Sequence, residues 1–295
     1  MKMNKWAFNI KFHSDLLQDT RNYLLKKGFI EIKTPKISFI PTDQDDHLFK
    51  VDYFKSEAYL IQSPQFYKQA YVLNGIDSVF EIGPVFRAEP RVTKRHLSEF
   101  NSLDIESSKF VKLDDLLEFE KKLLKEISQD LAQKYNLISP LNTFDIITYR
   151  EIKKALNLKD SEPIGNLHEK EISNYFNKDG IFIIEYSSDE RVFYYKENNG
   201  ISLSYDLIVR GLEITSGGVR ETHKREMIDK MKDNNINPLK YKQYLALFDK
   251  EVVPHGGFGL GIERFISRLL DYKDVGNILP YSKKPNTIKE HLKWK

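Results

Sequence analysis

Charged side chains of both signs crowd one segment, FRAEPRVTKRHLSEFNSLDIE, which spans residues 86–106. Its cations are Arg87, Arg91, Lys94, Arg95 and His96, and its acids are Glu89, Glu99, Asp104 and Glu106. A planar guanidinium suits the oxygen atoms of a phosphate or a carboxylate, and a carboxylate accepts hydrogen bonds from an amino group. A nucleic-acid surface would leave out most of the acids, so the mixture predicts a ligand that carries both phosphates and amino groups.

Two β-strands should present these charges. The run SVFEIGPVF, residues 78–86, is typical of a buried strand, and NSLDIESS, residues 101–108, alternates as a returning strand would. A cationic loop between them would hold a polyphosphate, while Phe100 offers a flat surface for a base.

Three glycines in HGGFGLGIERF form a second chemical segment. Gly257, Gly259 and Gly261 recur at period two, so on a strand they lie on one face and leave it bare. A helix should follow, with Arg264 in its first turn beside this surface. A β-bulge or close helix packing would also explain the glycines, but the alternation followed by an arginine favours a ligand. The spacing matches neither the GxGxxG fingerprint nor the phosphate loop.

The segment RGLEITSGGVR, residues 210–220, offers groups for a metal and for an anion. Glu213 and Ser216 supply a carboxylate and a hydroxyl, which are hard oxygen ligands that suit Mg²⁺. Arg220 offers a planar fork that suits a carboxylate. Taken alone the segment is ambiguous, because Glu and Arg on an edge strand are commonly solvated or paired with one another.

The segment QSPQFYKQ, residues 62–69, follows an expected strand and carries short polar groups. Ser63 and Gln65 would project from the turn, and Lys68 lies about one helical turn further on. In isolation this pattern is equally typical of a turn and a surface helix with an exposed lysine.

The remaining pattern predicts the elements that position these segments. Helices are expected at 14–27, with Ser14 as the N-cap, and at 114–135, 151–158, 221–233 and 240–248. Further strands are expected from Phe29 to the break at Pro35 and at 51–54, 58–62, 180–188, 191–195 and 201–218. Because strands come in neighbouring runs without strict βαβ alternation, we expect an α+β fold with a mainly antiparallel sheet.

The composition of the 295 residues is that of a globular protein, with 40% hydrophobic and 30% charged residues. The net charge of +3 permits a polyanionic partner without requiring one. The absence of cysteine excludes a disulfide framework, Cys-ligated zinc and a thiol nucleophile. No apolar run is long enough for a signal peptide or a membrane span, so we expect a cytoplasmic protein with no membrane partner.

Taken in order, these segments resemble the catalytic core of the class II aminoacyl-tRNA synthetases of subclass IIb, in particular the archaeal and eukaryotic aspartyl branch. GFIEIKTPKIS resembles the first class motif, with Pro35 at its dimer-forming proline. FRAE with RHLSEFNSLDIE resembles the second motif, GFGLGIERF resembles the third, and the resemblance extends from about Phe12 to about Leu279. It implies a single catalytic domain over residues 1–295, a mainly antiparallel six-stranded sheet flanked by helices, and a smaller insertion at about 140–200.

The resemblance also implies ATP and Mg²⁺ as cofactors. Arg87 would bind the α-phosphate of ATP, and Arg95, His96 and Arg264 would bind its β- and γ-phosphates. Glu89 and Phe100 would bind the adenine, and Gly261 would lie near the adenosine. Glu213 and Ser216 would hold Mg²⁺. Arg87 and Arg264 are the residues expected to be catalytic. No side chain need be a nucleophile, because the substrate's own carboxylate attacks, so catalysis would rest on positioning and electrostatic stabilisation.

Aspartate is the substrate that the resemblance implies. Lys68 and Arg220 would grip its side-chain carboxylate, and Ser63, Gln65 and Asp104 would read its α-amino group. Asparaginyl enzymes resemble this core but lack the lysine, and two cations suit a carboxylate better than a neutral amide.

Two departures from the family leave the acceptor of the aspartyl group open. In the segment PTDQDDHLF, Asp43 stands at the Glu of the family's Glu-Gly-Gly lid loop, Gln44 and Asp45 replace the glycines, and Asp46 follows. With the first helix expected at Ser14, no room remains for an N-terminal anticodon-binding β-barrel. We therefore expect transfer of the aspartyl group from aspartyl-adenylate to ammonia, with the acidic loop attracting ammonium.

The alternative is a core that charges or modifies tRNA, reaching the acceptor end without its own anticodon-binding domain. A catalytically inactive regulator is disfavoured because Arg87, Glu213 and Arg264 are all present. Under either acceptor a homodimer is expected, since the first class motif forms that interface in the family.

Overall fold

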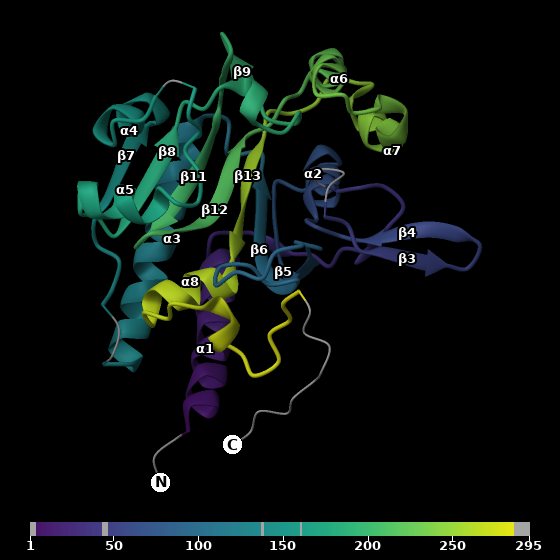
Figure 1. Ribbon diagram of the computed structural model, residues 1–295. Helices are drawn as coiled ribbons and strands as arrows, with labels where there is room; N and C mark the ends of the chain where they lie inside the picture. Colours follow the sequence, from purple (N-terminus) through teal and green to yellow (C-terminus); the bar gives the residue numbers. More distant parts are fainter. Residues whose placement is uncertain (1–3, 43–46, 137–138, 160, 286–295) are drawn as a thin grey trace.

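The computed structural model describes residues 4–42, 47–136, 139–159 and 161–285. Within these residues, eight strands form the main sheet in the order β1-β5-β6-β13-β12-β11-β8-β7 (Figure 1). The strands are β1 (Ile30–Glu31), β5 (Ser78–Phe86), β6 (Glu99–Ser107), β13 (Gly256–Gly261), β12 (Leu212–Val219), β11 (Ser204–Val209), β8 (Gly180–Ile184) and β7 (Phe144–Thr148).

The six inner strands, from β5 to β8, pair antiparallel with their neighbours, whereas β1 and β7 join the two edges in parallel. The predicted α+β class with a mainly antiparallel sheet is confirmed. The predicted number of six strands is wrong, because two parallel edge strands extend the six inner ones. The strand predicted from Phe29 contains β1, which has only two residues, whereas β7 was not predicted because it lies in the less regular insertion.

One face of the sheet is covered by three helices, α1 (Lys5–Lys26), α3 (Leu113–Lys134) and α8 (Ile262–Leu269) (Figure 1). Their apolar side chains form one buried cluster with alternate residues of the strands, among them Leu103 and Phe258. The residues that alternate with these apolar residues along β6 and β13 therefore face the other side of the sheet. None of the described helices is both long enough and apolar enough to span a membrane.

Two local predictions are wrong. The first helix begins at Lys5 rather than near Ser14, because Asn4 provides the N-cap and its side chain accepts a hydrogen bond from the Ala7 amide at 2.8 Å. Residues 191–195 form turns and an isolated bridge rather than a strand. The rings of this segment pack into a separate cluster with α6 and α7, which draws the chain away from the sheet.

On the second face of the sheet α2 (Gln65–Leu73) packs against β5 and β6, and α6 (Lys224–Asp233) and α7 (Lys242–Leu245) pack against α2 and residues 193–195. The helix predicted at 240–248 is split into α7 and a 3₁₀ turn on each side of it. A hairpin of β3 (Lys50–Tyr53) and β4 (Ser56–Leu60), which pairs with β2 (Ile37–Ser38), projects from this side (Figure 1).

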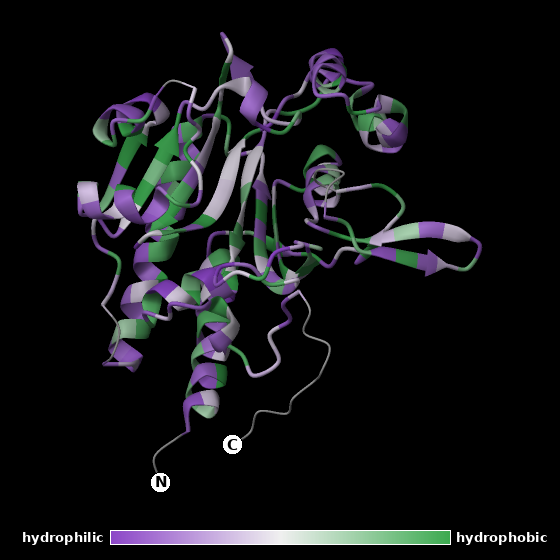
Figure 2. Cartoon of the chain, viewed as in Figure 1, coloured by the Kyte–Doolittle hydropathy of each residue, from purple (hydrophilic) through white to green (hydrophobic). Residues whose placement is uncertain are grey.

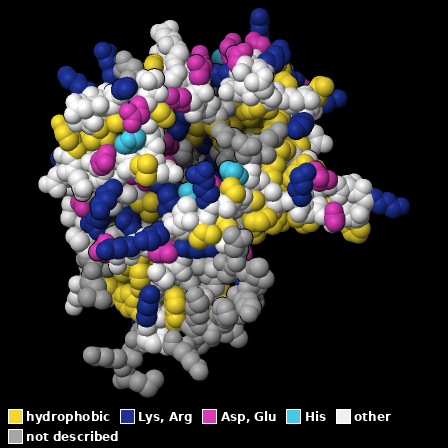
Figure 3. Space-filling model, viewed as in Figure 1, with side chains coloured by type: hydrophobic (Ala, Val, Ile, Leu, Met, Phe, Trp, Pro, Cys, Tyr) yellow, Lys and Arg dark blue, Asp and Glu magenta, His cyan; other side chains and the backbone are white. Residues whose placement is uncertain are grey.

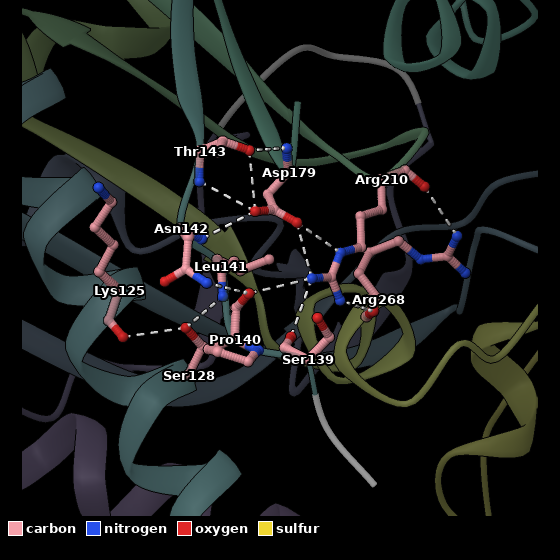
Figure 4. Close-up of polar contacts among 10 residues, drawn as sticks. All are labelled: Lys125, Ser128, Ser139, Pro140, Leu141, Asn142, Thr143, Asp179, Arg210 and Arg268. Atoms are coloured by element: carbon pink, nitrogen blue, oxygen red, sulfur yellow. Dashed lines mark hydrogen bonds and ion pairs between the residues drawn. The ribbon is translucent and has the colours of Figure 1, made fainter. Parts of the chain in front are cut away.

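The segment at 140–200 contains α4 (Tyr149–Ala155) and α5 (Glu169–Phe176) between β7 and β8, so its strands continue the main sheet. β8 is a mainly hydrophobic strand in Figure 2. Figure 4 shows the contacts of Asp179 in this segment. Its carboxylate accepts a hydrogen bond from the Asn142 backbone amide at 2.9 Å and another from Arg210 Nη2 at 2.9 Å. Arg210 in turn binds the carbonyl of Ser139 at 3.0 Å. The organisation as one catalytic domain over residues 1–295, with an insertion at about 140–200, stays a prediction.

Candidate active site

A cavity of about 340 Å³ opens on the second face of the sheet, over β6, β12 and β13. Figure 3 shows this side of the molecule, with Lys, Arg and His side chains around a central hollow. The predicted residues that line it are Ser63, Gln65, Lys68, Arg87, Phe100, Asp104, Glu213, Ser216, Arg220, Gly261 and Arg264. A small adjoining pocket is lined by Glu89, Arg95 and His96 together with Arg87, Phe100, Gly261 and Arg264. Four segments far apart in the sequence thus meet at one site.

The glycines of β13 have two different roles. A Cβ atom on Gly257 would lie 2.1 Å from the Ile105 carbonyl oxygen and 2.3 Å from Glu106 Oε2, so close packing alone requires a glycine there. Cβ atoms on Gly259 and Gly261 would instead come no nearer than 3.3 Å and 3.6 Å to another heavy atom. These two glycines line the cavity and leave its floor open. Close packing therefore explains Gly257, while the ligand interpretation of Gly259 and Gly261 stays a prediction.

A buried ionic network lies at one end of the cavity. Lys68 Nζ lies 3.0 Å from Asp104 Oδ1 and 3.6 Å from Glu106 Oε2. Arg220 binds Glu106 through two hydrogen bonds of 2.8 and 3.0 Å. All four side chains are buried. Although burial raises the pKa of Glu106, Arg220 and Lys68 hold it below its usual value.

Lys68 and Arg220, which by the resemblance would grip a substrate carboxylate, both belong to this network. Each cation already has a carboxylate partner, and Glu106 is a site residue that the sequence reasoning did not select. The alternation of Asp104 and Glu106 along one strand was the signal that could have found it. Arg220 Nη1 nevertheless remains buried without a hydrogen-bond partner in the described residues. Because Arg220 lines the cavity, this N–H group is a candidate donor to a ligand.

The aromatic segment at 191–195 and α2 fix the orientation of Arg220. Its guanidinium lies 5.5 Å from the Tyr194 ring centroid and 5.0 Å from that of Tyr195. Gln65 Oε1 accepts from Arg220 Nη2 at 3.2 Å. Cation–π contacts and this amide hold a planar guanidinium in one orientation, which favours recognition of a planar carboxylate.

The other end of the cavity is rich in cations. Arg87 lies over the Phe100 ring, with its guanidinium carbon 5.6 Å from the ring centroid. Arg264 donates to the Glu213 carbonyl at 3.0 Å and contacts the Glu213 carboxylate at 3.4 Å. Burial and the nearby Arg264 lower the pKa of His96 to about 4, so this imidazole is neutral at pH 7. Half-buried arginines beside a histidine that is neutral at pH 7 favour an anionic ligand.

A β-bulge brings Glu213 and Ser216 together. β11 pairs Leu207 with Thr215 and then Ile208 with Glu213, so Ile214 is the extra residue in β12. Both Glu213 and Ser216 consequently line the cavity, despite their odd spacing.

Arg191 and Asp206 lie beside this pair, and the sequence reasoning did not find them. Arg191 binds both carboxylate oxygens of Asp206, at 2.8 and 2.9 Å, and donates to Ser216 Oγ at 3.1 Å. Burial, followed by the charge of Asp206, raises the pKa of Glu213. A half-buried carboxylate next to a hydroxyl fits the hard-oxygen chemistry of Mg²⁺. The described residues contain no group of three or more His, Cys, Asp or Glu side chains arranged to hold a metal.

Four predicted positions are not among the described residues that line the cavity. Pro35 is exposed between β1 and β2, away from the residues that line the cavity. Asp43, Asp45 and Asp46 of the expected lid lie outside the described residues.

The antiparallel sheet, its glycine-lined floor and the cationic loop between β5 and β6 are those of a class II aminoacyl-tRNA synthetase catalytic fold. The family profile for class II tRNA synthetases (D, K and N) matches residues 1–285, and the chain belongs to this family.

Curated and solved relatives agree with this assignment. The chain is 36% identical to the aspartate-tRNA(Asp) ligase of Pyrococcus abyssi, covering 91% of this chain and 65% of that protein. It is 35% identical to the aspartate-tRNA(Asp/Asn) ligase of Thermus thermophilus, covering 90% and 67%. The asparaginyl-tRNA synthetase of Pyrococcus horikoshii, solved with asparaginyl-adenylate, superposes with a TM-score of 0.87 at 28% identity, covering 94% and 68%. The chain thus spans just under two thirds of the Pyrococcus abyssi ligase.

Proposed function

We propose that this protein activates L-aspartate with ATP to form aspartyl-adenylate and pyrophosphate, and transfers the aspartyl group to tRNA. The observation that carries the proposal is the polarity of the cavity. A buried end presents the unpartnered Nη1 of Arg220, and the opposite end gathers Arg87, Arg95 and Arg264. The open floor at Gly259 and Gly261 lies between them.

The aspartate end supports a dicarboxylic substrate. Arg220 Nη1 would donate to the side-chain carboxylate, and Lys68 would add a second positive charge from the floor. Asp104, Ser63 and Gln65 would accept from or orient the α-amino group. Because Asp104 and Glu106 balance both cations, selection of aspartate over asparagine would rest on the placement of N–H donors rather than on net charge.

The nucleotide end supports a triphosphate. Phe100 would stack on the adenine, Glu89 would accept from its amino group, and Arg95, His96 and Arg264 would contact the β- and γ-phosphates. Glu213 and Ser216 would hold Mg²⁺, which when bound neutralises phosphate charge. Arg87 and Arg264 would act as catalytic residues by stabilising charge on the reacting phosphate.

The first half-reaction needs no protein nucleophile. An oxygen of the aspartate α-carboxylate forms a bond with the α-phosphorus of ATP, and the bond from that phosphorus to the bridging oxygen of the β-phosphate breaks. Pyrophosphate leaves with the electron pair. Arg87 would hold the α-phosphate in line with the attacking oxygen, so positioning and preorganised charge would supply the acceleration.

The comparisons favour a different acceptor of the aspartyl group from the ammonia expected above. The curated relatives are named as aspartate-tRNA ligases, which supports tRNA rather than ammonia as acceptor. The expectation of ammonia depended on Asp43, Asp45 and Asp46, which lie outside the described residues. Transfer to ammonia therefore has no supporting observation among the described side chains.

Two assays test the proposal. Aspartate-dependent exchange of labelled pyrophosphate into ATP measures the first half-reaction, and exchange with asparagine but not aspartate would reject the substrate. Labelled aspartate with ATP and Mg²⁺ is then incubated with ammonium or with total tRNA. We expect acid-precipitable label in the tRNA reaction. Free labelled asparagine in the ammonium reaction would instead identify ammonia as the acceptor of the aspartyl group.

We also propose that the protein is a homodimer through the surface around Pro35. Three large apolar residues near this proline, Ile30, Ile37 and Phe39, are exposed. β1 lies at an edge of the main sheet, where its outer side is open to pairing. Sedimentation analysis of the protein and of an Ile30→Asp variant tests this, with a monomeric variant expected.

A further inference from the structure

Glu169 contacts two parts of the nucleotide end, although no sequence pattern singled it out. It is the first residue of α5 in the insertion, and it is buried. Its Oε1 accepts from Arg95 Nη2 at 2.6 Å, and its Oε2 accepts from the Glu213 backbone amide at 2.9 Å. One carboxylate therefore joins the insertion, the loop after β5 and the start of β12.

Arg264 closes this arrangement from the opposite side. Its Nε donates to the Arg95 carbonyl at 3.3 Å, and its Nη1 donates to the Glu213 carbonyl at 3.0 Å. Arg95 and Glu213 are thus held at two points each. The side chain of Arg95 is 16% exposed, and its Nε is buried without a partner in the described residues. Arg95 consequently has unused hydrogen-bonding capacity while its Nη2 is held by Glu169.

Three arginines, Arg87, Arg95 and Arg264, lie close together at this end. Burial, together with the charges of Arg95 and Arg87, lowers the pKa of Arg264, while Glu213 and Glu169 oppose the shift. A buried guanidinium is costly without an anionic partner. The Glu169 carboxylate supplies one to Arg95.

We propose that Glu169 is a positioning residue that occupies the anion-binding side of Arg95 in the empty site and is replaced there by the terminal phosphates of a nucleoside triphosphate. This inference rests on the proposed function. A phosphate offers a guanidinium the same bidentate geometry as a carboxylate, with more negative charge. The Glu213 amide remains bound to Glu169 Oε2, so the start of β12 keeps its place while Arg95 changes partner.

Glu169 therefore competes with the nucleotide and stabilises the empty enzyme. Removal of its charge should have two opposite effects, a lower thermal stability without nucleotide and a higher affinity for ATP. A residue that merely supports the fold would lower both.

The test compares Glu169→Gln with Glu171→Gln, a control in the same turn of α5 whose side chain is exposed. Calorimetric titration with ATP, without aspartate, measures affinity, and thermal unfolding measures stability. Glu169→Gln is expected to bind ATP about tenfold more tightly, because one charge-assisted hydrogen bond no longer has to be given up. Glu171→Gln should match the wild type. Unchanged or weaker ATP binding by Glu169→Gln would overturn the proposal.

Two further variants keep the test informative. In an Arg95→Gln background, Glu169→Gln should no longer tighten ATP binding, and persistence of the effect there would overturn the proposal. If Glu169→Gln does not fold, Glu169→Asp weakens the same pair and is expected to shift affinity in the same direction by a smaller factor. Wild-type protein that fails to bind ATP would reject the proposed function itself, whereas normal wild-type binding without tightening in the variant rejects this inference alone.

Discussion

Arg220 and Glu106 form a bidentate ion pair beneath the buried end of the cavity, with hydrogen bonds of 2.8 and 3.0 Å between side chains that are 1% and 0% exposed. Removal of the cation from such a pair leaves a buried charge that Lys68 only partly balances. Arg220→Met should therefore lower the free energy of unfolding by about 3–5 kcal/mol and abolish aspartate-dependent pyrophosphate exchange. Urea unfolding measures the first effect.

Arg225→Met is the control for this loss, because the Arg225 side chain is 90% exposed on α6. It should change stability by less than about 0.5 kcal/mol. Equal losses in the two variants would show that burial of the Arg220 pair contributes nothing.

Lys68→Met tests the basis of substrate choice. Lys68 holds Asp104 Oδ1 at 3.0 Å and lies 3.6 Å from Glu106 Oε2, so its removal leaves carboxylate oxygens at the cavity floor. These oxygens repel a substrate carboxylate but can accept from the amide of asparagine. We expect the ratio of kcat/KM for aspartate to that for asparagine to fall by about tenfold or more. Because both values come from one preparation, the ratio is insensitive to lost stability. An unchanged ratio would mean that Lys68 does not contribute to the choice between aspartate and asparagine.

The sequence predicted the parts of this site that lie within single motifs. Arg87 and Phe100 flank one loop, and Gly261 and Arg264 mark one strand-to-helix junction, so local patterns were sufficient. It did not predict Glu169, because its partners lie 44 and 74 residues away in the chain. Contacts of that kind depend on how β12 and the insertion pack.

Two local errors have the same origin. Ser14 has the side chain of an N-cap, but nothing between it and Asn4 interrupts the helix, and Asn4 provides the cap that forms. The run at 191–195 has the aromatic composition of a strand, yet Arg191 is drawn to Asp206 and the rings to the cluster around α6 and α7. Tertiary contacts overrode propensity in this segment.

Gly257→Ala and Gly261→Ala should separate packing from ligand binding along one strand. The added methyl of Gly257→Ala would lie 2.1 Å from a backbone oxygen of β6, so strands would have to shift. We expect a loss of about 1–3 kcal/mol in the free energy of unfolding. The methyl of Gly261→Ala meets only the Arg264 side chain at 3.6 Å, so this variant should fold normally but show a raised KM for ATP. Normal stability of Gly257→Ala would contradict the packing interpretation.

Glu120 lies on α3 beneath the sheet, and it should make the free energy of unfolding depend on pH. Its side chain is fully buried, and Tyr205 donates a hydrogen bond of 2.5 Å to its Oε2. Burial raises the pKa of Glu120 from 4.5 to about 7. The folded state therefore binds more protons than the unfolded state between these values, so the stabilisation from protonated Glu120 is complete below pH 4.5 and is lost as the pH rises through about 7.

Glu120→Gln keeps the shape and removes the titration. Relative to this variant, the wild type should lose about 3 kcal/mol of unfolding free energy between pH 4.5 and pH 8, because each pKa unit corresponds to about 1.4 kcal/mol. Urea unfolding of both proteins across this range gives the difference, in which the other titrating groups cancel. Glu126→Gln, on the exposed side of the same helix, should retain the wild-type slope. Parallel pH profiles for the wild type and Glu120→Gln would mean that Glu120 remains ionised inside the core.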